Sequence, residues 1–257
     1  MVDLKRVNEA LATYIRPQTF PLALCMVQEG EVPERARRPR QDLGFAIPVC
    51  QGIGMARRYG WTLALDRDDS ACPYGSLALG FEQPKPGFVE GTYRGGSPTP
   101  QAAARTAKAM KRLKVGQYRY LVASPLERAT FEPHLILVYG NSAQVMRLVQ
   151  GCLYGRGGSL LSTASGGMDC SDIIPQTILD DECHVILPCN GDRIFGLAQD
   201  HEMAFTIPLS KVEATIHGLE AGHRSGLQRY PIPAFMRFQS PLPESYNELM
   251  KYLKEGD

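Results

Sequence analysis

The sequence predicts a protein of the α+β class (mixed α/β), built from two related halves that together form one compact domain. Two observations predict this fold class. Short apolar segments typical of strands alternate with amphipathic segments typical of helices along the chain. Two stretches of the chain also repeat the same order of elements. The 257 residues can bury one sizeable core, so we treat 1–257 as a single compact domain.

The first half spans about residues 20–98 and follows an amphipathic helix at the N-terminus. Runs of Leu, Ala and Val predict buried strands, whereas Pro and charged residues predict surface loops. A glycine after an apolar-periodic segment predicts the end of a helix. The expected elements are a strand over 21–27, a loop over 28–44, a helix over 45–59 ending at Gly60, a strand over 61–66 and a loop over 83–98.

The second half spans about residues 117–222 and follows a helix predicted to begin at Thr99-Pro100 and to run to Gly116. Ser210 with Glu213 has the spacing of a capping box. The expected elements are strands over 118–126 and 134–140, a helix over 141–154, a helix from Cys170 to Leu179, a strand over 183–189, a loop over 190–202, a strand over 203–209 and a helix over 210–222. The tail, 223–257, is expected to be irregular up to a short final helix.

The repeat suggests an internal duplication with a cleft between two pseudo-equivalent halves. Each half contains a helix that ends in Tyr-Gly, at Tyr59 and at Tyr154, followed by a cysteine that opens a further helix. On this interpretation Cys72 and Cys170 are equivalent and flank the cleft. The alternative is a coincidence of common dipeptides.

Composition excludes several classes of function. The formal net charge of +1 gives no field that would attract nucleic acid or an anionic membrane. No apolar run approaches the roughly 20 residues that cross a bilayer. The N-terminal segment carries charges and lacks the apolar core of a signal peptide, so we expect a cytoplasmic protein.

The seven cysteines are the residues that could contribute most to a chemical function. Their number is odd and the chain is not small, which argues against a disulfide framework. Reduced cysteines serve as buried apolar fillers, as metal ligands or as reactive thiols. Cys72 precedes Pro73, and proline favours the first position of a helix, so Cys72 is expected to be an N-cap.

Several motifs resemble the domain-of-unknown-function 169 family of bacterial and archaeal proteins. They are CQGIGMARRYG from Cys50, Cys72 ahead of LALG, AQVMRLVQG over 143–151, Cys170, and LPCNGDRIFG over 187–196 followed by Ile207-Pro208. The resemblance runs from about Pro21 to Leu219, and its most specific part is Pro188 to Arg193. It implies that Cys50, Cys72, Cys170 and Cys189 are the functional cysteines. The family has no established activity, so the resemblance selects residues without naming a reaction.

The first hypothesis is a metal or iron–sulfur site held by Cys50, Cys72, Cys170 and Cys189. Thiolates select Zn²⁺ or iron–sulfur clusters. No Cys-x-x-Cys pair is present, and scattered single ligands suit a cluster held between two halves better than a zinc knuckle. Arg193 and Asn190 belong to the same motif as Cys189 and are candidate ligand-binding residues. A redox role, with a small molecule or a redox partner, follows as a further expectation.

The alternative hypothesis is a small-anion-binding protein or a thiol-dependent enzyme that uses a cysteine at a helix start in the same cleft. Arg193 would then face the cleft; the alternative is that Asp192 and Arg193 form an ion pair that closes a turn. Histidines are available as bases, but no spacing ties one to a cysteine, and His201 and Glu202 are expected to be exposed loop residues. The third interpretation is that the cysteines are buried fillers, favoured for Cys25, Cys152 and Cys183. The sequence leaves open whether the protein is an enzyme.

Overall fold

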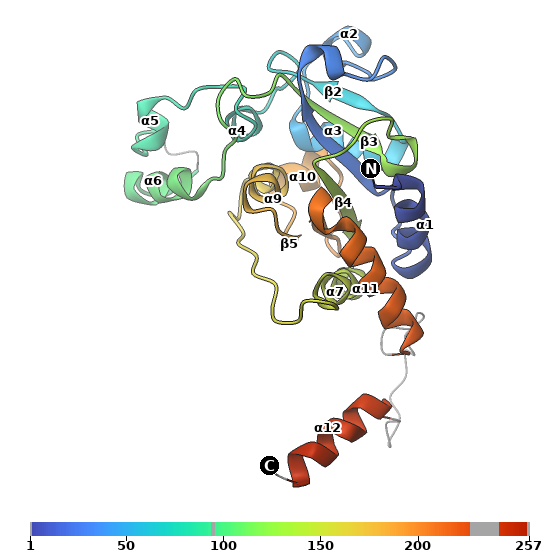
Figure 1. The fold of residues 1–257 in the computed structure, drawn as a ribbon. Coiled ribbons are helices and arrows are strands. Elements are labelled where there is room, and N and C mark those ends of the chain that lie inside the picture. The colour runs from blue at the N-terminus through green and yellow to red at the C-terminus, as the bar shows by residue number, and fades with distance from the viewer. Residues whose placement is uncertain (1, 94–95, 227–241, 256–257) are drawn as a thin grey trace.

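The computed structural model describes residues 2–93, 96–226 and 242–255. It contains helices and one antiparallel sheet whose strands are not in sequence order, which confirms the α+β class (Figure 1). The strands of the described residues are β1 (Leu22–Val27), β2 (Leu63–Leu65), β3 (Tyr120–Pro125), β4 (Leu135–Gly140), β5 (His184–Ile186) and β6 (Met203–Pro208). Nearly all of their residues are buried, because helices and loops cover both faces of the sheet.

The helices are short, and most begin at a proline or at a side-chain cap. The first group is α1 (Leu4–Tyr14), α2 (Pro39–Asp42), α3 (Val49–Tyr59), α4 (Pro73–Ala78), α5 (Pro86–Val89) and α6 (Pro100–Ala109). The second group is α7 (Ser142–Leu153), α8 (Asp169–Ile173), α9 (Pro175–Asp180), α10 (Asn190–Phe195), α11 (Val212–Arg224) and α12 (Glu244–Glu255). Single 3₁₀ turns lie at Glu29–Glu31, Leu126–Arg128 and Leu209–Lys211.

The strand order is β2-β3-β1-β4-β6-β5. The central pair is antiparallel, with Leu22 opposite Leu137. Outward from this pair, the strands are β1, β3 and β2 on one side and β4, β6 and β5 on the other. On each side, three strands that are consecutive in sequence are therefore arranged in the order first, third, second. The order therefore groups β3 with β1 and β2, whereas the predicted boundary had assigned residues 118–126 to the second half.

The two faces of the sheet carry different helices, because alternate residues of each strand point to opposite faces. Helices α1, α7 and α11 pack on one face, where Leu11, Leu148 and Ile216 share a buried cluster with Ile136 of β4. Helices α3, α4, α8 and α9 cover the other face, whose buried cluster includes Leu24 of β1. Cys50 and Cys170 lie on helices of this second face and Cys72 directly precedes one, whereas Cys189 directly precedes α10, which contacts α3.

Several predicted elements differ from the structure for local reasons. The helix expected over 170–179 is two helices, since Pro175 has no N–H and starts a new one. The loops expected over 28–44, 83–98 and 190–202 contain the short helices α2, α5 and α10. The predicted capping box at Ser210 is wrong, because the Ser210 hydroxyl donates to Asp181 and α11 begins at Val212.

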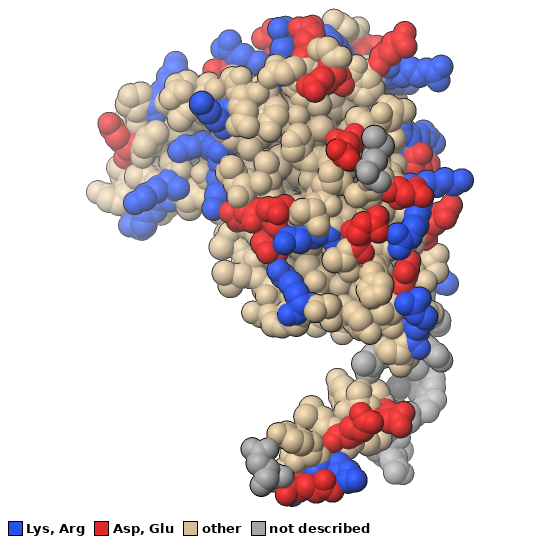
Figure 2. Space-filling model, in the orientation of Figure 1, with Lys and Arg blue, Asp and Glu red and all other residues tan. Residues whose placement is uncertain are grey.

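The C-terminal helix α12 confirms the predicted final helix, and none of its side chains is buried. The irregular tail predicted before it lies largely outside the described residues. Figure 2 shows lysine and arginine interspersed with aspartate and glutamate over the visible face, in keeping with the near-zero net charge. Among the described residues, no helix has the length and apolar character needed to cross a membrane.

Candidate functional site

Four cysteines lie in the first turns of four helices. Cys50 is the second residue of α3 and Cys170 the second residue of α8. Cys72 is the N-cap of α4, as Pro73 predicted, and Cys189 is the N-cap of α10. Local sequence thus sets each thiol at a point where a loop on one side of the sheet turns into a helix.

The positions of these cysteines relative to the strands differ from the predicted equivalence of Cys72 and Cys170. Cys50 and Cys170 each lie in a helix that precedes the second strand of a three-strand group, directly for α3 and with α9 in between for α8. Cys72 and Cys189 each follow that strand. The topology therefore pairs Cys50 with Cys170 and Cys72 with Cys189.

The structure brings the four cysteines near one another. The sulfurs of Cys189 and Cys50 lie 3.5 and 3.9 Å from the point that a Cβ atom on Gly191 would occupy. Burial raises the pKa of Cys170, and negative charge on Asp169 and on the other three thiols adds to that increase. The pKa of Cys50 is also raised by burial first, and then by negative charge on Asp169, Asp192 and two of the thiols. The thiol of Cys170 therefore lies within electrostatic reach of the other three, and that of Cys50 within reach of Cys72 and Cys189.

Two carboxyl groups, of Asp169 and Asp192, lie among the thiols. The backbone N–H and the thiol of Cys189 both donate to Asp169, at 3.1 Å each. Burial, followed by the charge of Asp169, raises the pKa of Asp192 to about 7. Sequence reasoning missed both residues, although Asp169 directly precedes Cys170 and Asp192 lies in the Cys189 motif.

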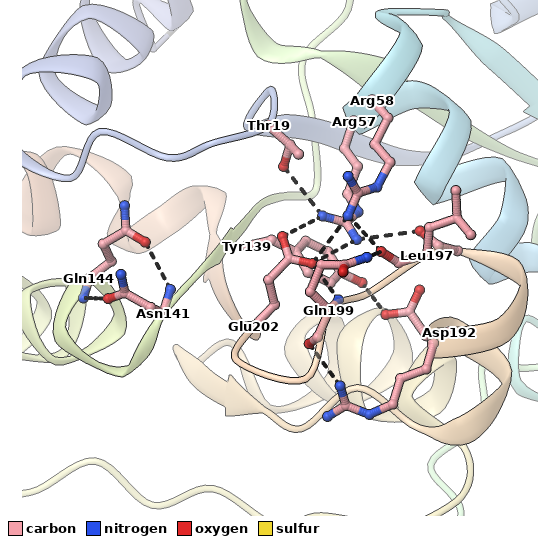
Figure 3. A network of polar contacts seen from close by, with 12 residues as sticks. Thr19, Arg57, Arg58, Tyr139, Asn141, Gln144, Asp192, Leu197, Gln199 and Glu202 are labelled. Atoms are coloured by element: carbon pink, nitrogen blue, oxygen red, sulfur yellow. Dashed lines mark hydrogen bonds and ion pairs between the residues drawn. The ribbon is translucent and has the colours of Figure 1, made fainter.

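A buried polar chain leads away from this cluster (Figure 3). Asp192 accepts a hydrogen bond of 2.8 Å from the hydroxyl of Tyr139, and the guanidinium of Arg57 lies 4.0 Å over the Tyr139 ring. Arg57 in turn donates to both carboxylate oxygens of Glu202, at 2.9 and 3.2 Å. This series of contacts connects the thiols to the Arg57–Glu202 ion pair at the C-terminal end of α3.

Glu202 is the clearest error of the sequence-based prediction. It was expected to be exposed, but only 4% of it is accessible. Arg58 and the backbone N–H of Gln199 also donate to it. No sequence signal marked this residue, because its main partner, Arg57, lies 145 positions earlier.

Asn190 and Arg193, the predicted ligand-binding residues, lie on α10 directly after Cys189. Arg193 donates to the Gln199 carbonyl at 2.8 Å and lies 3.7 Å from Asp200, so it closes the loop after α10. Asn190 is an exposed first residue of α10. The Asp192–Arg193 ion pair considered for this turn is replaced by separate contacts of each residue.

The remaining cysteines agree with the interpretation as buried fillers. Cys25, Cys152 and Cys183 are buried and free of disulfides. Cys25 lies 3.2 Å from Nδ1 of His134, a contact that sequence spacing did not reveal. Burial raises the pKa of Cys25 to about 11 and lowers that of His134, so both groups are neutral near pH 7.

The four thiols are chemically suited to bind a thiophilic metal, but their present positions do not form a coordination site. Among the described residues, no three His, Cys, Asp or Glu side chains are placed to hold a metal ion as they stand. Burial raises the pKa of Cys189 to about 11, so it carries a proton near neutral pH. Metal binding would require the sulfurs to rotate toward one point and to release their protons.

A large open cavity adjoins Cys72. Its volume is about 1000 Å³, and its lining includes both chain neighbours of Cys72, together with Arg40, Lys85 and Phe88. All of its lining residues lie between positions 40 and 93. The cavity is therefore within the first predicted half and not between the halves.

Comparison with known proteins agrees with the resemblance noted in the sequence. The model of the DUF169 family, described as "Uncharacterised ArCR", matches residues 10–218. The uncharacterised protein MJ0308 of Methanocaldococcus jannaschii is 27% identical over 176 residues, which cover 66% of this chain and 75% of that protein. No solved structure matches the chain.

Proposed function

Since the chain belongs to the DUF169 family, which is described as uncharacterised, we propose a function from its own residues: a cysteine-ligated metal or iron–sulfur site. The ligands would be Cys50, Cys72, Cys170 and Cys189. The observation that carries the proposal is the gathering of these four thiols from four separate segments of the chain.

The burial of the thiols supports this assignment over the filler interpretation. Cys50, Cys72 and Cys189 are only partly buried, unlike the three filler cysteines. Apolar fillers have no reason to collect beside two buried carboxyl groups, because each additional group that can ionise there raises the cost of a charge. A bound cation reverses this cost, since it stabilises thiolates and carboxylates together.

An iron–sulfur cluster is the preferred occupant, and zinc is the alternative. Both take four thiolates. Ligands that arrive singly from α3, α4, α8 and α10 suit a group as large as a cluster better than one small ion. A cluster would supply electron transfer, so a redox role with a small-molecule or protein partner belongs to the proposal. A cytoplasmic location belongs to it as well, since seven free thiols suit a reducing compartment.

Anaerobic purification of the full chain tests the proposal. We expect a brown protein with iron and sulfide in near-stoichiometric amounts, or a colourless protein with one zinc ion, measured by elemental analysis and absorbance. Separate Cys50→Ser, Cys72→Ser, Cys170→Ser and Cys189→Ser variants should each lose most of the metal. The matched control is Cys25→Ser, which removes a buried thiol outside the cluster and should leave the metal content unchanged.

A protein that stays free of iron and zinc after anaerobic purification and after incubation with iron and sulfide would contradict the proposal. Equal metal loss in Cys25→Ser and in the four cluster variants would contradict the ligand assignment.

We also infer that the two halves arose by duplication. The matching strand order on either side of the β1–β4 pair supports this inference. On this basis Cys50 and Cys170 form one equivalent pair and Cys72 and Cys189 the other. Serine variants within a pair should then weaken metal binding to a similar extent.

The second candidate is a thiol-dependent enzyme or small-anion-binding protein that uses Cys72. The cavity of about 1000 Å³ beside Cys72, with Arg40 and Lys85 in its lining, favours it. Alkylation with iodoacetamide followed by peptide mass spectrometry separates the two candidates. Rapid modification of Cys72 alone in a metal-free protein supports the second, whereas protection of all four cysteines in metal-loaded protein supports the first.

A further inference from the structure

A second cavity lies at the opposite end of α3 from Cys50. It has a volume of about 540 Å³, within the range of small-molecule sites. Its lining comes from α1, from the loop between α1 and β1, and from the end of α3. None of the four cluster cysteines lines it.

Three arginines line this cavity: Arg16, Arg57 and Arg58. The single carboxylate of Glu202 accepts hydrogen bonds from both Arg57 and Arg58, so two cations share one anion. Glu127 is the acidic residue in the lining, and it lies 3.5 Å from Arg128 outside that lining. Arg57, Arg58 and Glu202 together therefore carry a net positive charge at the edge of the cavity.

Arg57 is fully buried, and its Nε has no hydrogen-bond partner among the described residues. The buried Nε of Arg58 also lacks one. Neither Nε is accessible to solvent, so a ligand in the cavity would contact Arg58 through the 25% of its side chain that is exposed. Figure 3 shows both guanidinium groups meeting above Glu202, close to Thr19 of the cavity lining.

The loop that carries Arg16 is held rigidly. Gln144 of α7 donates to the carbonyl groups of Ile15 and Arg16, at 3.0 and 2.7 Å. Arg16 has a φ of 55°, a left-handed conformation that is uncommon outside glycine, asparagine and aspartate. A strained residue that is fixed by a neighbouring helix is typical of functional sites.

We propose that this cavity binds a small organic anion whose phosphate or carboxylate group is held by Arg16 and Arg58, while the buried Arg57 contributes positive charge behind them. Guanidinium groups pair with the oxygens of either group through two parallel hydrogen bonds. The volume leaves room for a ligand larger than a single phosphate ion. The site does not depend on a metal, although Arg57 connects it to Asp192 through Tyr139.

Isothermal titration of the full chain tests the proposal with two probes, pyrophosphate and citrate, which distinguish a phosphate ligand from a carboxylate ligand. We expect saturable binding of at least one probe. Arg16→Asn removes a charge and keeps a residue that tolerates the left-handed conformation. It should weaken binding about tenfold to a hundredfold, the range expected for hydrogen bonds between charged groups.

Arg58→Gln should weaken binding similarly, and circular dichroism would show whether this variant keeps its fold after losing a Glu202 contact. The matched control is Arg105→Gln on α6, an exposed arginine that does not line the cavity. Binding in the Cys50→Ser variant should match the original protein, which separates this proposal from the metal site. The proposal is overturned if neither probe binds, or if Arg105→Gln weakens binding as much as Arg16→Asn.

Discussion

Glu202 balances the charge of two arginines in a place that water hardly reaches. Its side chain is 4% exposed and that of Arg57 is fully buried. A buried ion pair contributes little net stability compared with apolar residues, but removal of one partner leaves the other charge uncompensated. The loss of stability on removing Glu202 should therefore be large, because Arg57 is completely buried.

We expect Glu202→Gln to lower the free energy of unfolding by about 3–5 kcal/mol, because Arg57 would remain buried without its carboxylate. Urea denaturation followed by circular dichroism would measure the change. Glu127→Gln is the control, since Glu127 is exposed and should change stability by less than about 0.5 kcal/mol. A similar loss in both variants would show that the buried pair has no special role.

Glu202 also predicts a pH dependence. Burial alone would raise its pKa, but hydrogen bonds and charge from Arg57 and Arg58 outweigh burial and lower it below the usual value of 4.5. As pH falls below about 4.5, the unfolded chain takes up a proton at Glu202 before the folded protein does, so the stability contributed by the pair is lost there. Melting temperatures measured between pH 3 and 6 should fall less steeply in Glu202→Gln than in the original protein.

Residues whose role depends on neighbours in sequence were predictable, and those that depend on distant neighbours were not. Cys72 was correctly predicted as an N-cap because Pro73 follows it. Glu202 was not, because its role depends on Arg57 across the fold. Asp169 and Asp192 gain their raised pKa values only when burial places them beside the thiols.

At the scale of elements, α3 approaches the loop after α10 very closely. A Cβ atom on Gly54 would lie 2.6 Å from the carbonyl oxygen and 2.8 Å from the Cα of Gly196. Both atoms belong to backbone and cannot rotate away. Because α3 carries Cys50 and Cys189 caps α10, the glycine at position 54 sets the spacing between two proposed ligands.

We expect Gly54→Ala to lower stability by about 1–3 kcal/mol, as overpacking does, and to reduce the metal content of the purified protein. Gly52→Ala is the matched control on the same helix. Its Cβ would meet side chains and no backbone, with Leu65 at 3.1 Å and Ile47 at 3.7 Å, and alanine favours a helix over glycine by about 1 kcal/mol. Equal effects of the two substitutions on metal content would contradict the spacing argument.

The strands were predictable as elements because each is a short apolar run that is buried on both faces. The helices α5 and α10 were missed, since segments of four and six residues carry too little periodicity to stand out from a loop. Pro175 was visible in the sequence, but its effect depends on whether the chain turns there.

At the scale of the whole molecule, α12 is the least integrated helix of the described residues. None of its side chains is buried, and the family match ends at residue 218, before this helix begins. The folded core should therefore hold its stability without it.

We expect deletion of residues 244–257 to shift the melting temperature by less than about 2 °C, because a helix with no buried side chain should contribute less than about 0.5–1 kcal/mol, which is the change that such a shift corresponds to. A longer deletion from residue 212 onward should prevent folding, since it removes Ile216 and Leu219 from the buried cluster on β4. A large loss of stability in the shorter deletion would show that α12 docks on the core.

The sequence was sufficient to predict the fold class and the family, but not the order of the strands. Repeated dipeptides indicated two halves, whereas pairing across more than 100 residues, as between Leu22 and Pro125, leaves no local signal.

The central position of β1 also has a consequence for biosynthesis. Leu22 leaves the ribosome early, yet it pairs with Pro125 on one side and Leu137 on the other. At roughly 5–20 residues per second, a nascent chain needs about 5–20 s to supply the first of these partners. During that interval six apolar residues have two unpaired edges. The cell must therefore keep this segment from aggregating before the chain is complete, and production in a host with limited chaperone capacity is expected to yield aggregates.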